Sequence, residues 1–134
     1  MIFVDASALI AIIADEADAD ELADCLERAE RRLCSALSLW ETVAGLCRSY
    51  RLSIPAARTH VAQFVDIAEF LVVAIGPTEF ETAMDAYTRY GKGRHHAALN
   101  MGDCFAYACA RTHNAALLFK GDDFSRTDIA RVMR

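Results

Sequence analysis

The sequence contains no apolar run long enough to cross a membrane. Its longest early apolar stretch, Ala8 to Ala14, is too short for a bilayer and lacks the basic flank of a secretory signal. This absence predicts a soluble, cytoplasmic protein with no membrane partner. The chain also lacks internal repeats and a low-complexity linker, and its 134 residues are close to the commonest domain size. We therefore expect residues 1–134 to form a single domain.

Paired cysteines are also missing. The five cysteines are an odd number, and no two of them form a C-x-x-C pair. This spacing argues against both a disulfide framework and a structural zinc site. Most of them are expected to be small core residues: Cys25, Cys34, Cys47, Cys104 and Cys109.

The chain has no excess of positive charge. Its formal net charge is -5, whereas broad affinity for nucleic acid rests on lysine and arginine neutralising phosphates. Any contact with nucleic acid must therefore be local. One stretch, RYGKGRHH, is basic, and it is either a solvated loop or a substrate contact. Its predicted substrate contacts are Lys92, Arg94 and His95, with His96 beside them.

Short β-rich runs alternate with longer helical runs along the chain. This order predicts an α/β fold with a mostly parallel sheet. Strands are expected at Ile2–Val4, Leu33–Ala36, Phe70–Ile75 and Ala116–Phe119, with a short fifth strand at Ile129–Met133. Helices are expected over about 5–16, 18–31, 38–50, 55–68, 78–90 and 102–112, and Ser38 and Thr78 are predicted caps.

Acidic residues far apart in the sequence stand where this topology brings them together. In a right-handed βαβ unit, the carboxyl ends of strands and the amino ends of helices lie at the same edge of the sheet. Each acid alone is explained by a helix cap, a helix dipole or a polar turn. If each acid had only such a structural role, all of these independent roles would have to fall at the same edge. Carboxylates gathered there without a counter-ion would repel one another, which suggests that a cation balances them. The predicted set is Asp5, Glu41, Asp103, Asp122 and Asp123.

This arrangement predicts a metal site made of oxygen ligands. Carboxylates favour Mg²⁺ or Mn²⁺ over zinc, which would call for histidine or cysteine ligands. A hard cation polarises phosphoryl oxygens and lowers the pKa of bound water, so phosphodiester hydrolysis is the natural reaction. Ser7, two residues after Asp5, is predicted to supply a hydroxyl to such a water and to contact the substrate. Ser7, a histidine and Asp5 make a poor catalytic triad, because nothing specifies their geometry.

Four segments carry a resemblance to a known family. They are FVDASAL, the ETV segment, YGKGRHHAALNMGDCFAYACA and LLFKGDDFSRTDI. With them the chain resembles PIN-domain ribonucleases, specifically the VapC-type toxins of bacterial toxin–antitoxin systems, over nearly its whole length. The resemblance implies a three-layer α/β/α fold with strand order 3-2-1-4-5. It also implies a homodimer and a VapB-like antitoxin that covers the acidic groove, where an antitoxin arginine would pair with carboxylates.

The resemblance also assigns roles to the acids. Asp5, Glu41 and Asp103 match its three acidic positions, with Asp5 and Asp103 as direct metal ligands and Glu41 positioning metal or water. The family often places a fourth aspartate where this chain has Gly121. Either Asp122 or Asp123 takes that role, or the site works with three principal acids.

Of the two candidates for the fourth acid, Asp123 is favoured because it directly precedes Phe124. The leading prediction is a Mg²⁺- or Mn²⁺-dependent endoribonuclease that inhibits translation by cutting structured or translation-related RNA, with Lys92 and Arg94 on phosphate.

The sequence leaves three other functions to consider. A haloacid-dehalogenase-type phosphatase requires a D-x-D pair, and here Ser7 follows Asp5 at that spacing. A phospho-receiver module would use Lys120, but no acceptor aspartate follows the third predicted strand. A catalytically silent PIN-like binding module is suggested by Gly121 and opposed by the three retained acids.

Overall fold

A parallel sheet forms the centre of the molecule. The computed structural model describes residues 1–134. Four strands lie in the order β3-β2-β1-β4, and every neighbouring pair is parallel. Phe3 is opposite Leu33 on one side and Leu117 on the other. The strands are β1 (Ile2–Val4), β2 (Arg32–Ser35), β3 (Leu71–Val73) and β4 (Ala116–Leu118).

The predicted fifth strand is reduced to a single bridge. Arg131 forms one isolated parallel bridge with Leu117, whose amide donates to Ala130 O at 2.8 Å. The segment touches β4 at one point because Ile129 is buried in the core and the end of the chain runs to ion pairs with Asp18 and Glu21. The α/β class and the order 3-2-1-4 are therefore confirmed. The predicted short strand at 129–133 is not formed, and one bridge stands in its place beside β4.

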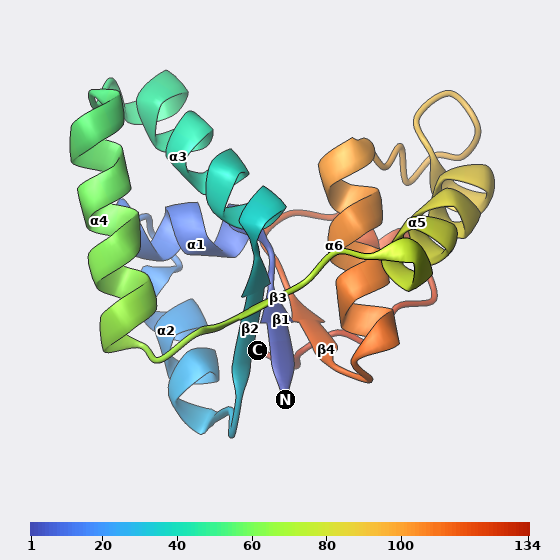
Figure 1. The fold of residues 1–134 in the computed structure, drawn as a ribbon, viewed down its shortest axis with the longest axis horizontal. Coiled ribbons are helices and arrows are strands. Elements are labelled where there is room, and N and C mark those ends of the chain that lie inside the picture. The colour runs from blue at the N-terminus through green and yellow to red at the C-terminus, as the bar shows by residue number, and fades with distance from the viewer.

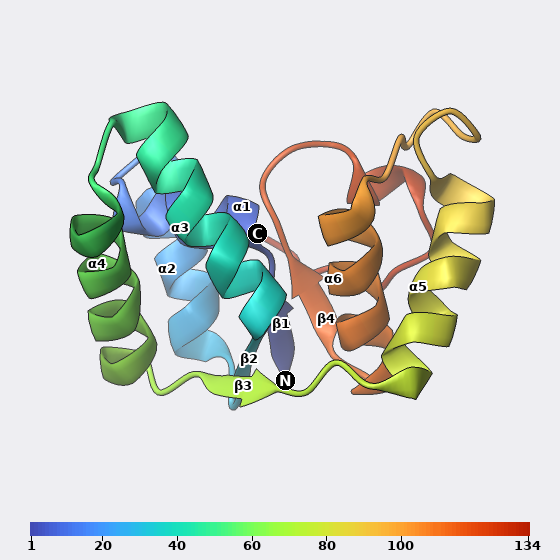
Figure 2. The ribbon, with the colours of Figure 1, turned by 45° about the horizontal axis from the view of Figure 1, so that its top comes forward.

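Helices cover both faces of the sheet (Figure 1). Helices α5 and α6 cover one face, and α1 and α2 cover the other, with α3 and α4 packed on the α1 side (Figure 2). This is the predicted three-layer arrangement. The helices are α1 (Ala6–Ile13), α2 (Ala19–Arg28), α3 (Ala36–Tyr50), α4 (Ile54–Ile67), α5 (Pro77–Tyr90) and α6 (Met101–Thr112), followed by the 3-10 helix η1 (Phe124–Arg126).

Two helices begin earlier than the sequence predicts. Ser35, and not Ser38, caps α3, and the Ser38 amide donates to the Ser35 hydroxyl at 3.1 Å. Ser38 instead completes a capping box, because its own hydroxyl accepts from the Ser35 amide. Gly76, and not Thr78, precedes α5, and the Glu79 carboxylate accepts from its amide at 2.8 Å.

Alternating side chains of the short strands divide the core into two parts. Phe3 packs toward α5 and α6, while Ile2 and Val4 pack toward α1 and α2. Cysteines contribute as small core residues, since all five are free and four are buried. No helix combines the length and the apolar character needed to span a bilayer.

Candidate acidic active site

Asp5 lies at the carboxyl end of β1 and caps α1. Its amide donates to Leu118 O of β4 at 2.9 Å, so the sheet holds its backbone. Its Oδ2 accepts from the Ser7 amide at 3.0 Å and from the Ser7 hydroxyl at 2.6 Å. The side chain is 6% exposed. Asp5 is therefore a fixed, buried carboxylate with only one oxygen engaged.

Glu41 reaches the same edge from α3. It lies in the second turn of that helix and not in the first, because the helix begins at Ala36. A Cβ added at Gly102, in the first turn of α6, would overlap with Oε2 of Glu41 and lie 2.7 Å from Oε1. The carboxylate of Glu41 thus rests against the backbone of α6, and it makes no hydrogen bond.

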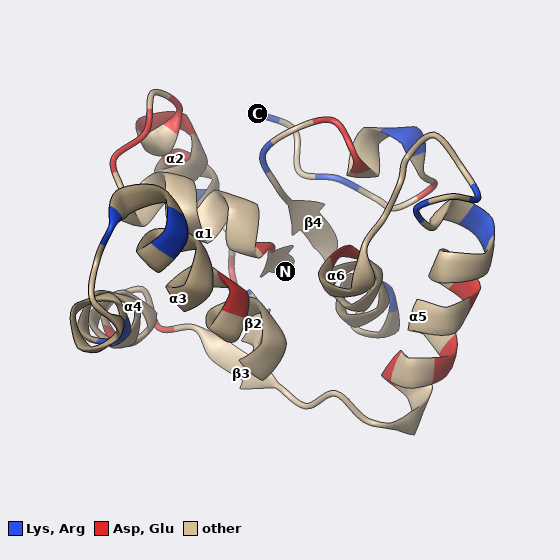
Figure 3. Ribbon diagram, turned by 90° about the horizontal axis from the view of Figure 1, so that it is seen from above, with Lys and Arg blue, Asp and Glu red and all other residues tan.

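Asp103 is held at the amino end of α6 by a capping box. Its amide donates to Asn100 Oδ1 at 2.9 Å, and its Oδ2 accepts from the Asn100 amide at 3.0 Å. This exchange leaves Oδ1 of Asp103 without a partner. Viewed from above, acidic stretches of α3, of α6 and of the segment after β4 surround the end of the sheet (Figure 3).

The carboxylates perturb one another. Burial, followed by repulsion from Asp5 and Asp103, raises the pKa of Glu41 to about 7. Burial likewise raises the pKa of Asp103 to about 6, with repulsion from Asp5 and Asp123 adding to it. The pKa of Asp5 is also raised, first by burial and to a smaller extent by Asp123. No lysine or arginine forms an ion pair with any of these acids.

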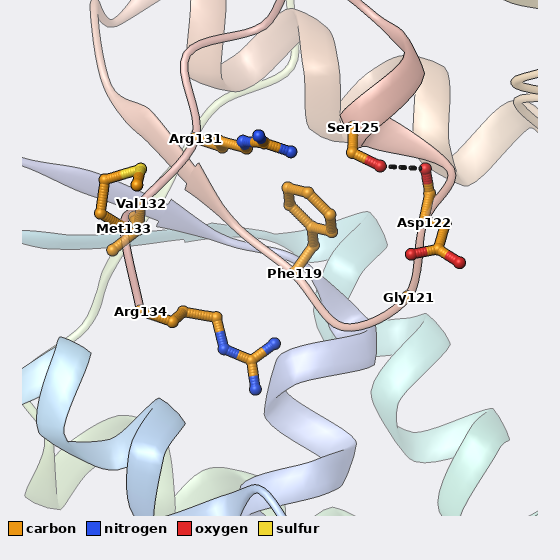
Figure 4. A pocket seen from close by; sticks show the side chains of 8 residues that line it. All are labelled: Phe119, Gly121, Asp122, Ser125, Arg131, Val132, Met133 and Arg134. Carbon is orange, nitrogen blue, oxygen red and sulfur yellow. Dashed lines mark hydrogen bonds between the residues drawn. The ribbon is translucent and has the colours of Figure 1, made fainter.

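The structure separates the two aspartates that follow β4. Asp123 is the one whose charge acts on Asp5 and Asp103. Asp122 lines a neighbouring pocket together with Phe119 (Figure 4). The turn between β4 and η1 passes through Gly121, whose φ of +100° is a conformation that glycine adopts without strain.

The donor chemistry of this edge suits a hard cation. Asp5 and Asp103 each offer a free oxygen, Glu41 offers two, and their mutual repulsion lacks a positive partner. No three acidic, histidine or cysteine side chains stand close enough to form a closed metal cluster as they lie here. The oxygen set fits Mg²⁺ or Mn²⁺ in kind, because these cations bind through few protein carboxylates and keep several waters.

Ser7 has a different environment from the predicted one. Its hydroxyl donates to Asp5 and accepts from the Lys120 amide at 3.0 Å, so it links β1 to the segment after β4. The Lys120 side chain in turn forms ion pairs with Glu16 and Asp18. The Ser7 proton is therefore committed within the protein.

The predicted basic contacts lie in the loop between α5 and α6. Lys92 and Arg94 are exposed, and the Arg94 guanidinium lies 5.1 Å from the ring centroid of Tyr87. His95 Nδ1 accepts from the Ala97 amide at 3.0 Å. The carbonyl of His96 accepts from the guanidinium of Arg126, the last residue of η1, at 3.1 Å. None of these side chains contacts the acids.

Sequence reasoning missed two residues of the site, Asn100 and Gly102. Asn100 fixes Asp103, and Gly102 leaves the space that the Glu41 carboxylate occupies. A signal for Gly102 existed: glycine within a helix costs about 1 kcal/mol relative to alanine, so its presence in a first turn calls for a reason.

Comparisons with known proteins agree on one family. The profile of the PIN domain matches residues 2–130. Ribonuclease VapC30 of Mycobacterium tuberculosis is 41% identical over 129 residues, covering 96% of this chain and 96% of that protein. VapC ribonuclease R02377 of Rhizobium meliloti is 40% identical over 141 residues, covering 96% and 99%.

Solved structures show the same fold. The crystal structure of Mycobacterium tuberculosis VapC20, described as a sarcin-ricin loop cleaving toxin, superposes with a TM-score of 0.78 at 22% identity and covers all of both chains. VapBC2 of Rickettsia felis, solved bound to a DNA fragment from its promoter, gives a TM-score of 0.74 at 14% identity, covering 99% of this chain and 98% of that one.

Proposed function

Because this chain belongs to the PIN-domain family and, within it, to the VapC ribonucleases, we propose that it is an endoribonuclease toxin. It hydrolyses phosphodiester bonds of RNA, inhibits translation and is neutralised by a cognate VapB-type antitoxin. The observation that carries the proposal is the meeting of Asp5, Glu41, Asp103 and Asp123 at one sheet edge. There the charges of Asp5 and Asp103 raise the pKa of Glu41, and the charge of Asp123 raises the pKa of Asp5 and of Asp103.

Four carboxylates have roles in metal binding and proton transfer at this site. Asp5 and Asp103 would hold Mg²⁺ or Mn²⁺ through their free oxygens, and Asp123 serves as the fourth acid in preference to Asp122. A divalent cation supplies Lewis acidity toward a phosphoryl oxygen and toward water. Glu41, whose pKa is raised to about 7, is suited to accept a proton from the attacking water.

Positioning residues complete this site. Ser7 orients Asp5 and ties it to the Lys120 backbone, so we assign Ser7 to positioning and not to substrate contact. Lys92, Arg94 and His95 remain proposed substrate contacts. They lie on the loop that leads into α6, and Lys92 and Arg94 are free of ion pairs, so their charge is available for RNA phosphates away from the acids.

A cleavage assay tests the proposal. A defined RNA pool is incubated with the purified protein in Mg²⁺, in Mn²⁺ or in EDTA, beside Asp5→Asn and Asp103→Asn. We expect cutting in either metal, none in EDTA, and at least a hundredfold loss in both variants. The exposed Asp85→Asn is the matched control and keeps full activity. Unchanged metal-dependent cutting by Asp5→Asn and Asp103→Asn would sink the site assignment.

Two partners follow from the proposal. The antitoxin covers the acidic edge, where one of its arginines pairs with carboxylates and competes with the cation.

The second partner is another copy of this chain. An apolar groove of about 790 Å³ lies between α3 and α4, and its wall includes Trp40 and Ile54, which are 69% and 62% exposed. We propose this groove as the homodimer face.

A further inference from the structure

A second cavity lies beside the acids and has no part in the site described above. It has a volume of about 260 Å³ and is enclosed by the turn after β4, by η1 and by the last residues of the chain (Figure 4). We call it the C-terminal pocket. The residues that give it chemical character are Phe119, Asp122, Ser125, Arg131 and Arg134.

The C-terminal pocket and the acids open at the same edge of the sheet. Asp5 ends β1, Phe119 follows β4, and the Arg131 bridge is parallel to β4 on its outer side. Neighbouring strands are about 4.8 Å apart, so the backbones of β4 and of the Arg131 bridge lie about one and two strand spacings from the backbone of β1. Asp122 of the pocket is also bonded directly to Asp123 of the acidic site. One RNA strand can therefore meet both.

Two opposite charges in the walls of the pocket, those of Arg131 and Asp122, form no ion pair. Arg131 is exposed and forms no ion pair, whereas Arg134 is occupied by Asp18 and Glu21. The Asp122 carboxylate makes no hydrogen bond, and only its backbone carbonyl accepts, from Ser125 Oγ at 2.6 Å. A free carboxylate opposes the binding of a bare phosphate, so the pocket does not suit a phosphate group alone.

Between these charges lies an aromatic side chain. The Phe119 ring lies among the lining residues of the pocket, below Arg131 in the view of Figure 4. Its ring centroid is 5.1 Å from that of Phe124. A nucleobase matches such walls. Guanine presents two adjacent N–H donors to a carboxylate and, on another edge, O6 and N7 acceptors to a guanidinium. Unstacked RNA bases are commonly held on aromatic or guanidinium planes.

We propose that the C-terminal pocket receives a guanine base of the RNA strand next to the scissile phosphodiester, with Asp122 accepting from its N–H groups and Arg131 contacting its acceptor edge. This inference rests on the proposed ribonuclease function for the identity of the ligand as RNA. It assigns to Asp122 a role in recognition, distinct from the role of Asp123 among the acids.

Direct binding tests the pocket without any cleavage. Guanosine 5′-monophosphate is titrated by calorimetry into the metal-free protein in EDTA, beside Arg131→Gln and Asp122→Asn. We expect each variant to weaken binding at least tenfold, and neither adenosine 5′-monophosphate nor inorganic phosphate to compete. The matched control is Arg31→Gln, which loses the same charge at an exposed position preceding β2, at the opposite edge of the sheet. It leaves binding unchanged.

Mapping of RNA ends then separates this proposal from the ribonuclease function. With the wild type, cuts fall at a fixed position relative to a guanine, and Arg131→Gln and Asp122→Asn lower that preference at least tenfold. A wild type that binds the guanine nucleotide yet cuts no RNA contradicts the ribonuclease function and leaves the pocket standing. Equal nucleotide affinity in folded wild type and both variants overturns the pocket. Loss of antitoxin affinity alone in Arg131→Gln also overturns it, in favour of a protein ligand.

Discussion

At the scale of single residues, the site is a balance between burial and charge. Burial and two neighbouring acids raise the pKa of Glu41 from its ordinary 4.5 to about 7. Its carboxylate makes no hydrogen bond, so what holds it in place is the shape of the surroundings, above all the missing side chain at Gly102. A glycine can therefore control a catalytic carboxylate that it does not bind.

Gly102→Ala is expected to lower the RNA cleavage rate about tenfold to hundredfold while leaving the fold intact. The added methyl overlaps with the end of a flexible side chain, so Glu41 swings away instead of the backbone moving. Alanine is also the better helix former, by about 1 kcal/mol. Thermal unfolding and single-turnover cleavage measure the two effects separately.

The matched control is Gly76→Ala, where the new Cβ meets Glu79 Oε1 at an ordinary 3.6 Å. It should change neither stability nor cleavage appreciably. Combining Gly102→Ala with Glu41→Gln should cost no more than Glu41→Gln alone. Additive losses in that double variant would show that Gly102 acts on something other than Glu41.

At the scale of elements, the segment after β4 is fastened at several points. Lys120 is held through its amide by Ser7 and through its side chain by Glu16 and Asp18. Further along, Asp128 accepts from the Tyr107 hydroxyl of α6 at 2.6 Å and forms ion pairs with Arg89 and Arg111. These contacts fix η1 and the turn that carries Asp122 and Asp123.

Asp128→Asn is expected to destabilise the protein by about 1 to 2 kcal/mol at neutral pH, a value reduced by the partial exposure of the group. The Tyr107 hydroxyl, followed by the two arginines, holds the pKa of Asp128 well below its ordinary value of 3.8. A lowered folded-state pKa stabilises above the unfolded pKa, and the contribution is lost as the pH falls through the folded one.

Urea unfolding at pH 7 and at pH 3 measures this effect. The difference in unfolding free energy between wild type and Asp128→Asn should be larger at pH 7 and shrink toward acid. Asp85→Asn, which removes an exposed carboxylate without ion pairs, is the control and should show no such difference. A constant difference at both pH values would contradict the ionic role of Asp128.

At the scale of the whole molecule, two surfaces remain to be covered. The acidic edge gathers four carboxylates in a chain whose net charge is already -5, which favours a basic antitoxin segment. The groove between α3 and α4 is apolar, and Trp40 and Ile54 in its wall are largely exposed.

If the groove is the homodimer face that we propose, Ile54→Ser is expected to weaken the dimer at least tenfold. Removing an isoleucine from an interface forfeits about 1.5 to 3 kcal/mol, and a two-fold axis counts each substitution twice. Analytical ultracentrifugation measures the equilibrium, and Trp40, the single tryptophan, should shift its emission to the red on dilution. Ile67→Ser, at an 80% exposed position at the far end of α4, is the control. A dimer unaffected by Ile54→Ser would rule out this face.

Much of the fold was predictable because the strands are short, apolar and separated by amphipathic helices. The six helices and the parallel α/β class follow that pattern, whereas the strand order 3-2-1-4 came from the family resemblance. The reduction of the fifth strand to one bridge was not predictable, because Ile129 is apolar in the sequence whether it pairs in a sheet or is buried in the core. The cap at Ser35 was missed because Ser38 carries the same hydroxyl three residues later. Gly76 was missed because it has no side chain to cap a helix, whereas Thr78 has a hydroxyl.

The sequence alone predicted that Asp5, Glu41 and Asp103 share an edge, because parallel topology places the ends of these strands and helices together. The tertiary structure added that the charge of Asp123 raises the pKa of Asp103, which is why Asp123 is the proposed fourth acid. It alone showed Gly102 yielding space to Glu41 and a pocket closed by Arg131. Topology is encoded in periodic pattern, whereas side-chain direction depends on contacts between residues distant in the chain.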